Sequence, residues 1–364
     1  MQPKRILVVQ PSWVGDAVMA TPALRALRDL YPKAHIAYLC RRYVKPIYNG
    51  LTFFDKVITY RTGKVRSKSG PSLLKIAARL RPAKFDTAIL LTNSFKTALL
   101  CKMAGIPRIV GYERDGRGFL LSDKLLPQKE SGKFVPSPIV HYYLGVVHYL
   151  GSRQNDIHME LAVTTGERRR AIQVLTRSGL DPEIDKPHTA GKGPLVMINA
   201  GAQYGAAKCW LPEYFAAVAD RLVEEQNATI LLSGAPKERR IMDSIQRHMK
   251  HSAVDLASKG LTLGSLKDIV RRCDLMITND TGPRHIAAAF DVPVVTIFGP
   301  THPQWTEIYF AKEAKVSVKV VCGPCQKKLC PLDHRCMTQV TPEIVYQKAL
   351  DLLAPTSPQR PATV

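Results

Sequence analysis

The 364-residue chain lacks any apolar run near the ~20 residues that a membrane-spanning helix needs, which argues against an integral membrane protein. Its first residues, MQPKRILVVQPSWVGD, contain neither a long apolar segment nor a small-residue cleavage site. We therefore expect no secretory signal and a cytoplasmic location. A G-x-G-x-x-G dinucleotide fingerprint and an Asp-x-Asp metal motif are also missing, and the first of these absences disfavours a dehydrogenase.

Acidic residues are scarce relative to basic ones, with 30 Asp and Glu against 52 Lys and Arg and a net charge of +22. The excess is uneven, because residues 1–180 carry +19 of it. A field of this sign attracts nucleic acid, an anionic membrane surface or a phosphorylated or carboxylated substrate. No helix-turn-helix, RNA-recognition or basic-zipper pattern supports the nucleic-acid interpretation.

Short apolar segments alternate with helix-length amphipathic segments in both halves of the chain. In the first half we predict strands near 6–9, 35–39, 56–60 and 86–91, and helices near 16–30, 71–80 and 95–103. In the second half we predict strands near 195–199, 229–233, 274–278 and 293–298, and helices near 212–226, 236–249, 264–272 and 283–290. This alternation predicts an α/β fold with two doubly wound, Rossmann-like domains.

The domain boundaries follow from composition. Residues 181–194 are rich in proline, glycine and charge, and we interpret them as a linker between domains 1–180 and 195–340. A last helix is expected over 341–354, because Thr341-Pro342-Glu343 is typical of a helix start. We expect the tail, residues 355–364, to be disordered.

The first segment with candidate catalytic or binding residues is PSWVGD, residues 11–16, directly after the first predicted strand. Ligands of open parallel sheets bind at the carboxyl ends of strands. Asp16 therefore has two interpretations: a helix-dipole partner in the first turn, or a general base.

Three more segments follow predicted strands of the second half. In NAGAQYGAAKCWLP (199–212), small residues let backbone amides approach an anion and Lys208 offers a point charge. In TNDTGPRHIAAA (278–289), a helix N-terminus presents free N–H groups suited to a pyrophosphate. In GAPKER (234–239), Glu238 is positioned to accept ribose hydroxyl hydrogen bonds. The alternative interpretations are an ordinary loop for residues 199–212, a helix cap for residues 278–289 and a solvated glutamate for Glu238.

Together these segments resemble the ADP-heptose:lipopolysaccharide heptosyltransferases of glycosyltransferase family 9, closest to the heptosyltransferase II branch. The resemblance is carried by PSWVGD (11–16), NSFKTAL (93–99), GAQYGAAKCW (201–210) and NDTGPRHIAAAF (279–290). It implies a GT-B architecture, in which two Rossmann-like domains face each other across a cleft. It also implies inverting transfer of L-glycero-D-manno-heptose to heptosyl-Kdo2-lipid A in lipopolysaccharide core biosynthesis, with no required cofactor.

The resemblance assigns roles to individual residues. Asp16 matches the proposed base, and Lys208 matches a donor-binding position that also stabilises the leaving diphosphate. The remaining donor-binding candidates are Asn199, Gly201, Tyr204, Glu238, Asp280, Thr281, Gly282 and His285. The acceptor-binding candidates are Ser12, Trp13, Asn93, Lys96, Arg61, Lys64 and Arg66. The implied partners are ADP-heptose, the anionic lipid A–Kdo core and the cytoplasmic face of the inner membrane, and not nucleic acid.

A basic segment, RTGKVRSK, spans residues 61–68 and contains no acid. It is either a solvated loop or a binding surface for the carboxylates and phosphates of the acceptor core. Lys96, Arg114 and Arg117 are expected to join it in the second case.

Four cysteines, Cys322, Cys325, Cys330 and Cys336, fall within fifteen residues and enclose His334. The spacing C-x₂-C-x₄-C-x₃-H-x-C is typical of soft-metal ligands such as those of zinc or an iron–sulfur centre. Reduced structural thiols and a redox pair are the alternatives. A metal is not needed for the transfer that the resemblance implies.

Two other functions stay open. Another family 9 enzyme, a heptosyltransferase I or a later-acting one, would differ in its acceptor. A nucleotide-sugar epimerase of the same architecture would form product without any acceptor.

Overall fold

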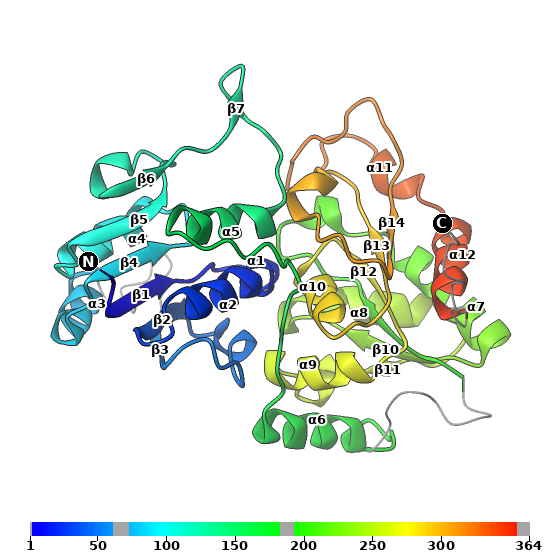
Figure 1. The fold of residues 1–364 in the computed structure, drawn as a ribbon. Helices are drawn as coiled ribbons and strands as arrows, with labels where there is room; N and C mark the ends of the chain where they lie inside the picture. The colour runs from blue at the N-terminus through cyan, green and yellow to red at the C-terminus, as the bar shows by residue number, and fades with distance from the viewer. Residues whose placement is uncertain (1, 61–72, 183–192, 355–364) are drawn as a thin grey trace, which may run out of the picture. The chain divides into compact units, whose positions relative to one another are not determined.

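The computed structural model describes residues 2–60, 73–182 and 193–354. The chain divides into two compact units (Figure 1). The first unit comprises residues up to Thr164 together with Gln304–Ile308, and the second comprises Thr165–Pro303 and the residues from Tyr309 onward.

The first unit is built on a six-stranded parallel sheet with the order β3-β2-β1-β4-β5-β6. Its strands are β1 (Arg5–Val9), β2 (His35–Arg41), β3 (Lys56–Tyr60), β4 (Thr87–Leu90), β5 (Arg108–Tyr112) and β6 (Asp123–Leu125). The central strands β1 and β4 are almost wholly buried, as expected of a sheet covered on both faces. The helices are α1 (Val14–Met19), α2 (Thr21–Leu30), α3 (Leu73–Leu80), α4 (Phe95–Met103) and α5 (Ile139–Tyr149), with short turns η1 (Lys45–Ile47), η2 (Arg81–Ala83) and η3 (Gly118–Leu120). A small hairpin, β7 (Lys129–Glu130) with β8 (Lys133–Phe134), completes the unit.

The helix predicted over 16–30 is in fact two helices, α1 and α2. Pro22 has no N–H and therefore cannot continue the hydrogen-bond ladder to the carbonyl of Val18. The Thr21 hydroxyl donates to that carbonyl instead, at 2.7 Å. The break leaves α1 as a short helix whose first turn carries Asp16.

The second unit repeats the topology of the first, with the strand order β11-β10-β9-β12-β13-β14. Its strands are β9 (Leu195–Asn199), β10 (Thr229–Ser233), β11 (Val254–Asp255), β12 (Leu275–Asn279), β13 (Val294–Ile297) and β14 (Glu313–Val316). Its helices are α6 (Thr165–Arg177), α7 (Pro212–Gln226), α8 (Arg239–His248), α9 (Leu263–Arg272), α10 (Gly282–Ala289), α11 (Arg335–Thr338) and α12 (Pro342–Leu353), with short turns η4 (Ala206–Lys208), η5 (Pro236–Glu238) and η6 (Ala257–Lys259). Both sheets thus have the doubly wound order that the sequence predicted.

The boundary between the units lies before α6, whereas composition pointed to residues 181–194. Lys267 of α9 is fully buried, and its ammonium group lies 3.1 Å from the Glu167 carboxylate of α6. A buried ammonium group needs such a partner, so this pair attaches α6 to the second unit. Most of the expected linker, residues 183–192, lies outside the described residues, as does the tail 355–364.

Among the helices of the described ranges, none combines the length and the apolar character that crossing a bilayer requires.

Candidate functional site

Doubly wound sheets create their binding crevice where the strand order reverses, because the loops on either side of that point leave the sheet in opposite directions. In the second unit this point lies between β9 and β12, which are neighbours in the sheet but far apart in sequence. The loop after β9 carries Lys208, and the turn after β12 carries Asp280 and Thr281. The topology therefore explains why two separate motifs meet.

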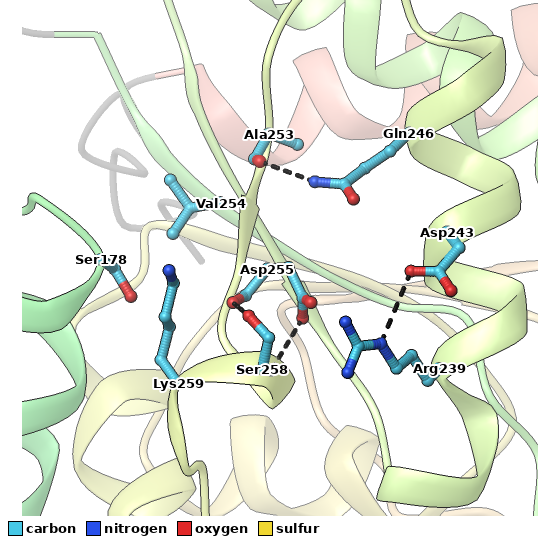
Figure 2. Close-up of a pocket in the computed structure, with 9 residues that line it drawn as sticks. All are labelled: Ser178, Arg239, Asp243, Gln246, Ala253, Val254, Asp255, Ser258 and Lys259. Carbon is cyan, nitrogen blue, oxygen red and sulfur yellow. Dashed lines mark hydrogen bonds and ion pairs between the residues drawn. The ribbon is translucent and has the colours of Figure 1, made fainter.

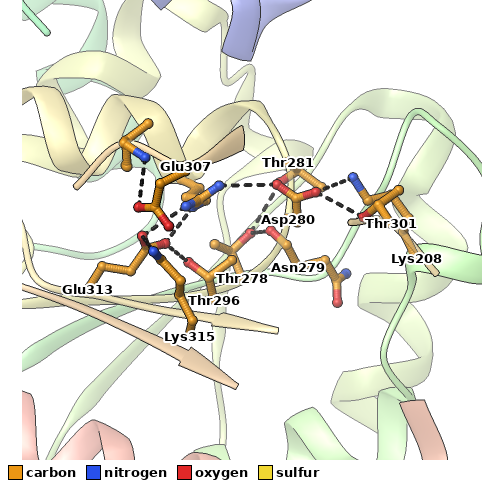
Figure 3. Close-up of polar contacts among 12 residues, drawn as sticks. Lys208, Thr278, Asn279, Asp280, Thr281, Thr296, Thr301, Glu307, Glu313 and Lys315 are labelled. Carbon is orange, nitrogen blue, oxygen red and sulfur yellow. Dashed lines mark hydrogen bonds and ion pairs between the residues drawn. The ribbon is translucent and has the colours of Figure 1, made fainter. Parts of the chain in front are cut away.

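Lys208 and Asp280 form a buried ion pair at this point (Figure 3). The Lys208 Nζ lies 2.5 Å from Asp280 Oδ2, and the two side chains are 10% and 3% exposed. The Thr301 hydroxyl donates to the same carboxylate oxygen at 3.1 Å. An ammonium group with three donors can hold Asp280 and still offer protons to an anionic ligand.

A second ion pair supports the first. Arg284, in the first turn of α10, donates to Asp280 Oδ1 at 3.3 Å and to both carboxylate oxygens of Glu313, at 2.5 and 2.8 Å. Glu313 is fully buried on β14 and also accepts from the Thr296 hydroxyl at 2.6 Å. The network therefore places the charges of Lys208, Arg284 and Lys315 against those of Asp280 and Glu313.

This environment fixes the charge of Asp280. Burial opposes ionisation, but the coulombic attraction of Lys208 and Arg284 outweighs it and holds the pKa of Asp280 well below its usual range. Asp280 is therefore an anion at every pH at which the protein would be studied.

His285 follows Arg284 on α10 and is buried. Burial, reinforced by the Arg284 charge, lowers the pKa of His285 from 6.5 to about 3, so the imidazole is neutral near pH 7. Its Nδ1 is a buried atom without a hydrogen-bond partner in the part of the chain that the structure describes. A buried ring nitrogen in this state is suited to meet a polar atom of a ligand.

Asn199 and Thr281 lie beside this network and are engaged with the protein. The Asn199 amide donates to the carbonyl and hydroxyl of Ser233, at 3.1 and 3.0 Å, and accepts a 3.4 Å contact from the Thr281 hydroxyl. The hydroxyl of Thr278 bonds to the Asn199 carbonyl. Asn199 thus joins the ends of β9, β10 and β12, while Thr281 and Gly282 begin α10.

Gly201 and Glu238 are in contact. A Cβ at position 201 would lie 2.3 Å from the Glu238 carboxyl group, so a larger residue there would displace this carboxyl group. Glu238 also accepts the Ala235 N–H at 2.7 Å, which fixes the turn after β10. Tyr204 lies on the same loop, and its ring faces the Lys208 ammonium group at 5.4 Å.

In the first unit, Asp16 lies in the first turn of α1, at the carboxyl end of β1. Tyr143 of α5 donates its hydroxyl to Asp16 Oδ1 at 3.0 Å. Ser12 and Trp13 precede it; the Ser12 carbonyl accepts from the Tyr43 hydroxyl, and the Trp13 side chain is exposed.

Asn93 follows β4, on the other side of the switch point of the first sheet. Its Oδ1 accepts from the Tyr142 hydroxyl at 2.8 Å and from Arg117 at 3.3 Å. Arg117 was expected on an acceptor-binding surface, but it is fully buried and also donates to the carbonyls of Thr92 and Tyr112, so it organises the strand ends instead. Lys96 is exposed at the start of α4, and Arg61, Lys64 and Arg66 lie outside the described residues.

The four clustered cysteines line one recess with His334. All eight cysteines of the chain are free thiols. Burial, and then the neighbouring thiols of Cys322, Cys325 and Cys330, raise the pKa of Cys336 to about 11. No group of three or more His, Cys, Asp or Glu side chains in residues 2–60, 73–182 and 193–354 is arranged to hold a metal ion.

The cysteine segment has a contact that its spacing did not predict. The Ala207 N–H donates to the Lys328 carbonyl at 3.0 Å, and the His334 ring nitrogen contacts the Ala207 carbonyl at 2.8 Å. The Tyr204 hydroxyl donates to the Gln326 carbonyl at 2.5 Å. The segment therefore fixes the loop that carries Lys208.

A separate cavity of about 390 Å³ lies in the second unit between α8, β11 and the end of α6 (Figure 2). Its charged side chains are mixed in sign: Arg239, Asp243, Asp255 and Lys259. Asp255 is engaged in capping the turn η6, and Arg239 lies 3.9 Å from Asp243. None of the candidate site residues lines this cavity.

The family model for glycosyltransferase family 9 (heptosyltransferase) matches residues 73–335. The chain belongs to glycosyltransferase family 9. It is 26% identical over 358 residues to lipooligosaccharide heptosyltransferase 2 of Haemophilus influenzae, covering 96% of this chain and 99% of that protein. It is also 26% identical to lipopolysaccharide heptosyltransferase 2 of Escherichia coli, covering 96% and 98%. Among solved structures, a family 9 glycosyl transferase from Veillonella parvula superposes with a TM-score of 0.78 at 22% identity, covering 96% and 97%. The ADP-heptose lipopolysaccharide heptosyltransferase II of E. coli superposes with a TM-score of 0.74 at 24% identity, covering 96% and 98%.

These matches confirm the predicted GT-B fold of this family 9 chain. The sequence did not predict Arg284 as a second partner of Asp280, Glu313 as the partner of Arg284, or Tyr143 as the partner of Asp16. No spacing signal could have found Glu313 or Tyr143, since each meets its partner through tertiary packing. Arg284 lies four residues after Asp280, which is the spacing of an ion pair on a helix. The sequence could therefore have predicted this pair.

Neutral buried His285 makes the stability of this family 9 chain sensitive to acid. Between pH 6.5 and 3 the unfolded state binds a proton that the folded state excludes, so stability is lost as pH falls, by up to about 1.4 kcal/mol per pH unit. We predict that His285→Asn reduces the loss of unfolding free energy between pH 7 and pH 5, measured by urea denaturation, by roughly 2 kcal/mol. His248→Asn, which changes an exposed histidine of α8, serves as the control. Equal losses in wild type and His285→Asn would contradict the buried neutral imidazole.

Proposed function

We propose that this chain transfers L-glycero-D-manno-heptose from ADP-heptose to the heptosyl-Kdo2-lipid A inner core of lipopolysaccharide. The observation that carries the proposal is the full-length similarity to heptosyltransferase 2 proteins, which covers 96% of the chain. It is supported by the position of the matching motifs, which lie at the carboxyl ends of β1, β4, β9 and β12.

The proposed reaction is one in-line displacement with inversion at the anomeric carbon of the heptose. An acceptor hydroxyl oxygen forms the new bond to that carbon while the bond from carbon to the β-phosphate oxygen breaks. The bonding electron pair leaves with ADP, and the hydroxyl proton passes to the Asp16 carboxylate. General-base assistance of this kind is typically worth ~10²–10⁴-fold in rate.

On the donor side, negative charge grows on the β-phosphate as the bond breaks. Lys208 can meet that charge at little reorganisation cost, because its ion pair with Asp280 already holds the ammonium group in place. The start of α10 adds backbone N–H groups from the turn at Thr281 and Gly282. Pro283 contributes none, since it has no N–H.

An acceptor series tests the function. We expect transfer from ADP-heptose to an acceptor that bears one heptose, with no transfer to acceptors bearing none or two, measured by mass spectrometry of the product. Transfer to the acceptor without heptose would instead indicate a heptosyltransferase I activity. Conversion of donor in the absence of any acceptor would indicate an epimerase.

Two matched variants separate the chemical roles of the two units. We predict that Asp16→Ala retains ADP binding, measured by calorimetry, but loses transfer by ~10²-fold or more because the base is gone. Lys208→Ala should weaken ADP binding and slow transfer, because the phosphate loses its cation. Wild-type transfer by Asp16→Ala would end its assignment as base, and unchanged ADP affinity in Lys208→Ala would remove Lys208 from the donor site.

We also propose that the first unit contacts the anionic inner face of the membrane that holds the acceptor. Support comes from Phe95 and Phe119, which are 39% and 74% exposed with ring centroids 5.9 Å apart. Phe95 is the first residue of α4 and is followed by the exposed Lys96, while Phe119 lies within η3. An exposed aromatic pair next to a cation is typical of interfacial binding to anionic lipid.

Vesicle binding tests this contact. We predict that Phe95→Ser combined with Phe119→Ser lowers co-sedimentation with phosphatidylglycerol-containing vesicles by roughly tenfold, because two rings no longer enter the interface. Leu329→Ser, at a similarly exposed apolar residue of the second unit, is the control. Undiminished binding by the double variant would exclude this pair as the membrane contact.

A further inference from the structure

The proposed base is held by a side chain from a distant part of the chain. Tyr143 of α5 lies 127 residues after Asp16 and donates its hydroxyl to Asp16 Oδ1 at 3.0 Å. The helix α1 packs against both α5 and the turn η1, so the contact is enclosed by three elements of one unit.

The Tyr143 hydroxyl is suited to remain a hydrogen-bond donor to Asp16. Its side chain is only 3% exposed. Burial, followed by the charge of Asp16 and the hydrogen bond to it, raises the pKa of Tyr143 well above its usual value. The phenol therefore keeps its proton throughout the working pH range and remains a donor.

Two other tyrosines, Tyr48 and Tyr142, lie near Tyr143. Tyr48, beside η1, is fully buried, and burial is the largest of the causes that raise its pKa well above the usual value. Its hydroxyl donates to Gln10 Oε1 at 3.1 Å. Tyr142, whose ring centroid lies 6.1 Å from that of Tyr143, donates to Asn93. Burial likewise raises the pKa of Tyr142, so these neighbours do not change charge while Asp16 titrates.

We propose that Tyr143 is a positioning residue for the transfer reaction, which fixes the rotamer of Asp16 and stabilises its ionised form. This inference rests on the proposed role of Asp16 as base. A base must be ionised before it takes a proton, and its free orbital must point at the acceptor hydroxyl. One hydrogen bond from a buried, uncharged donor serves both needs.

The test is the pH profile of kcat for Tyr143→Phe, with ADP-heptose and the single-heptose acceptor. Loss of a donor raises the pKa of a carboxylate, so the acid limb should move to higher pH by about one unit. The plateau should fall roughly tenfold to a hundredfold, the effect of one hydrogen bond to a charged group. KM for ADP-heptose should stay unchanged, because Tyr143 belongs to the other unit.

Tyr48→Phe is the matched control, because it also removes a buried hydroxyl next to η1 but takes its hydrogen bond from Gln10. It should leave the position of the acid limb as in wild type. Thermal melting of both variants checks that each remains folded, and phenylalanine fits the space of either tyrosine ring.

The variant Asp16→Asn separates the two hypotheses. If Asp16→Asn transfers heptose at the wild-type rate, the proposed role of Asp16 fails, whatever Tyr143 does. If Asp16→Asn is inactive and Tyr143→Phe has the wild-type plateau and acid limb, the positioning role of Tyr143 is overturned while the base survives. An equal shift of the limb in Tyr48→Phe would also overturn it.

Discussion

The ion pair between Lys208 and Asp280 is the interaction on which the second unit depends most. Removing two charges from water is costly, and mutual attraction offsets the cost only where the geometry is good. Here Asp280 receives Lys208 on one oxygen and Arg284 on the other, and Glu313 in turn neutralises Arg284. Loss of Lys208 would leave Asp280 with Arg284 alone, and Arg284 is shared with Glu313. The charges thus hold η4, α10 and β14 in one fixed arrangement.

The first unit, which has the same sheet topology, also contains a buried cation. Its buried cation, Arg117, is met by the carbonyls of Thr92 and Tyr112 and by the amide oxygen of Asn93. Burial lowers the pKa of Arg117. The positive charge is balanced by dipoles at the carboxyl ends of β4 and β5.

The sequence was sufficient for most of the architecture, because strand and helix periods are local. The strands β1, β9, β10 and β12 lie where the apolar runs predicted them. The sequence did not predict β5, β6, β14 or α5. These elements are short or combine apolar with polar residues. The prediction of one helix over 16–30 was wrong in one respect, because Pro22 interrupts the hydrogen-bond ladder between α1 and α2.

The candidate site was predictable to the extent that its residues lie in motifs next to strand ends. Lys208 and Asp280 were found that way, and the sheet order explains their meeting. Tyr143 and Glu313 could not be found, because a lone tyrosine on a helix and a lone glutamate on a strand carry no local signal. Their partners are set by packing between elements that are distant in sequence.

The contact between the cysteine segment and the Lys208 loop has a consequence for the order in which the protein is made. Ala207 is held by Lys328 and His334, and the Trp210 indole donates to the Val340 carbonyl at 2.8 Å. Synthesis proceeds from the N-terminus, so the partners of this loop leave the ribosome more than a hundred residues after it. Until they do, the nascent chain can form both sheets and the Lys208–Asp280 ion pair, but the loop around Ala207 and Trp210 lacks these contacts. The loop that carries Lys208 therefore reaches its final conformation late, when the last segments of the second unit have folded onto it.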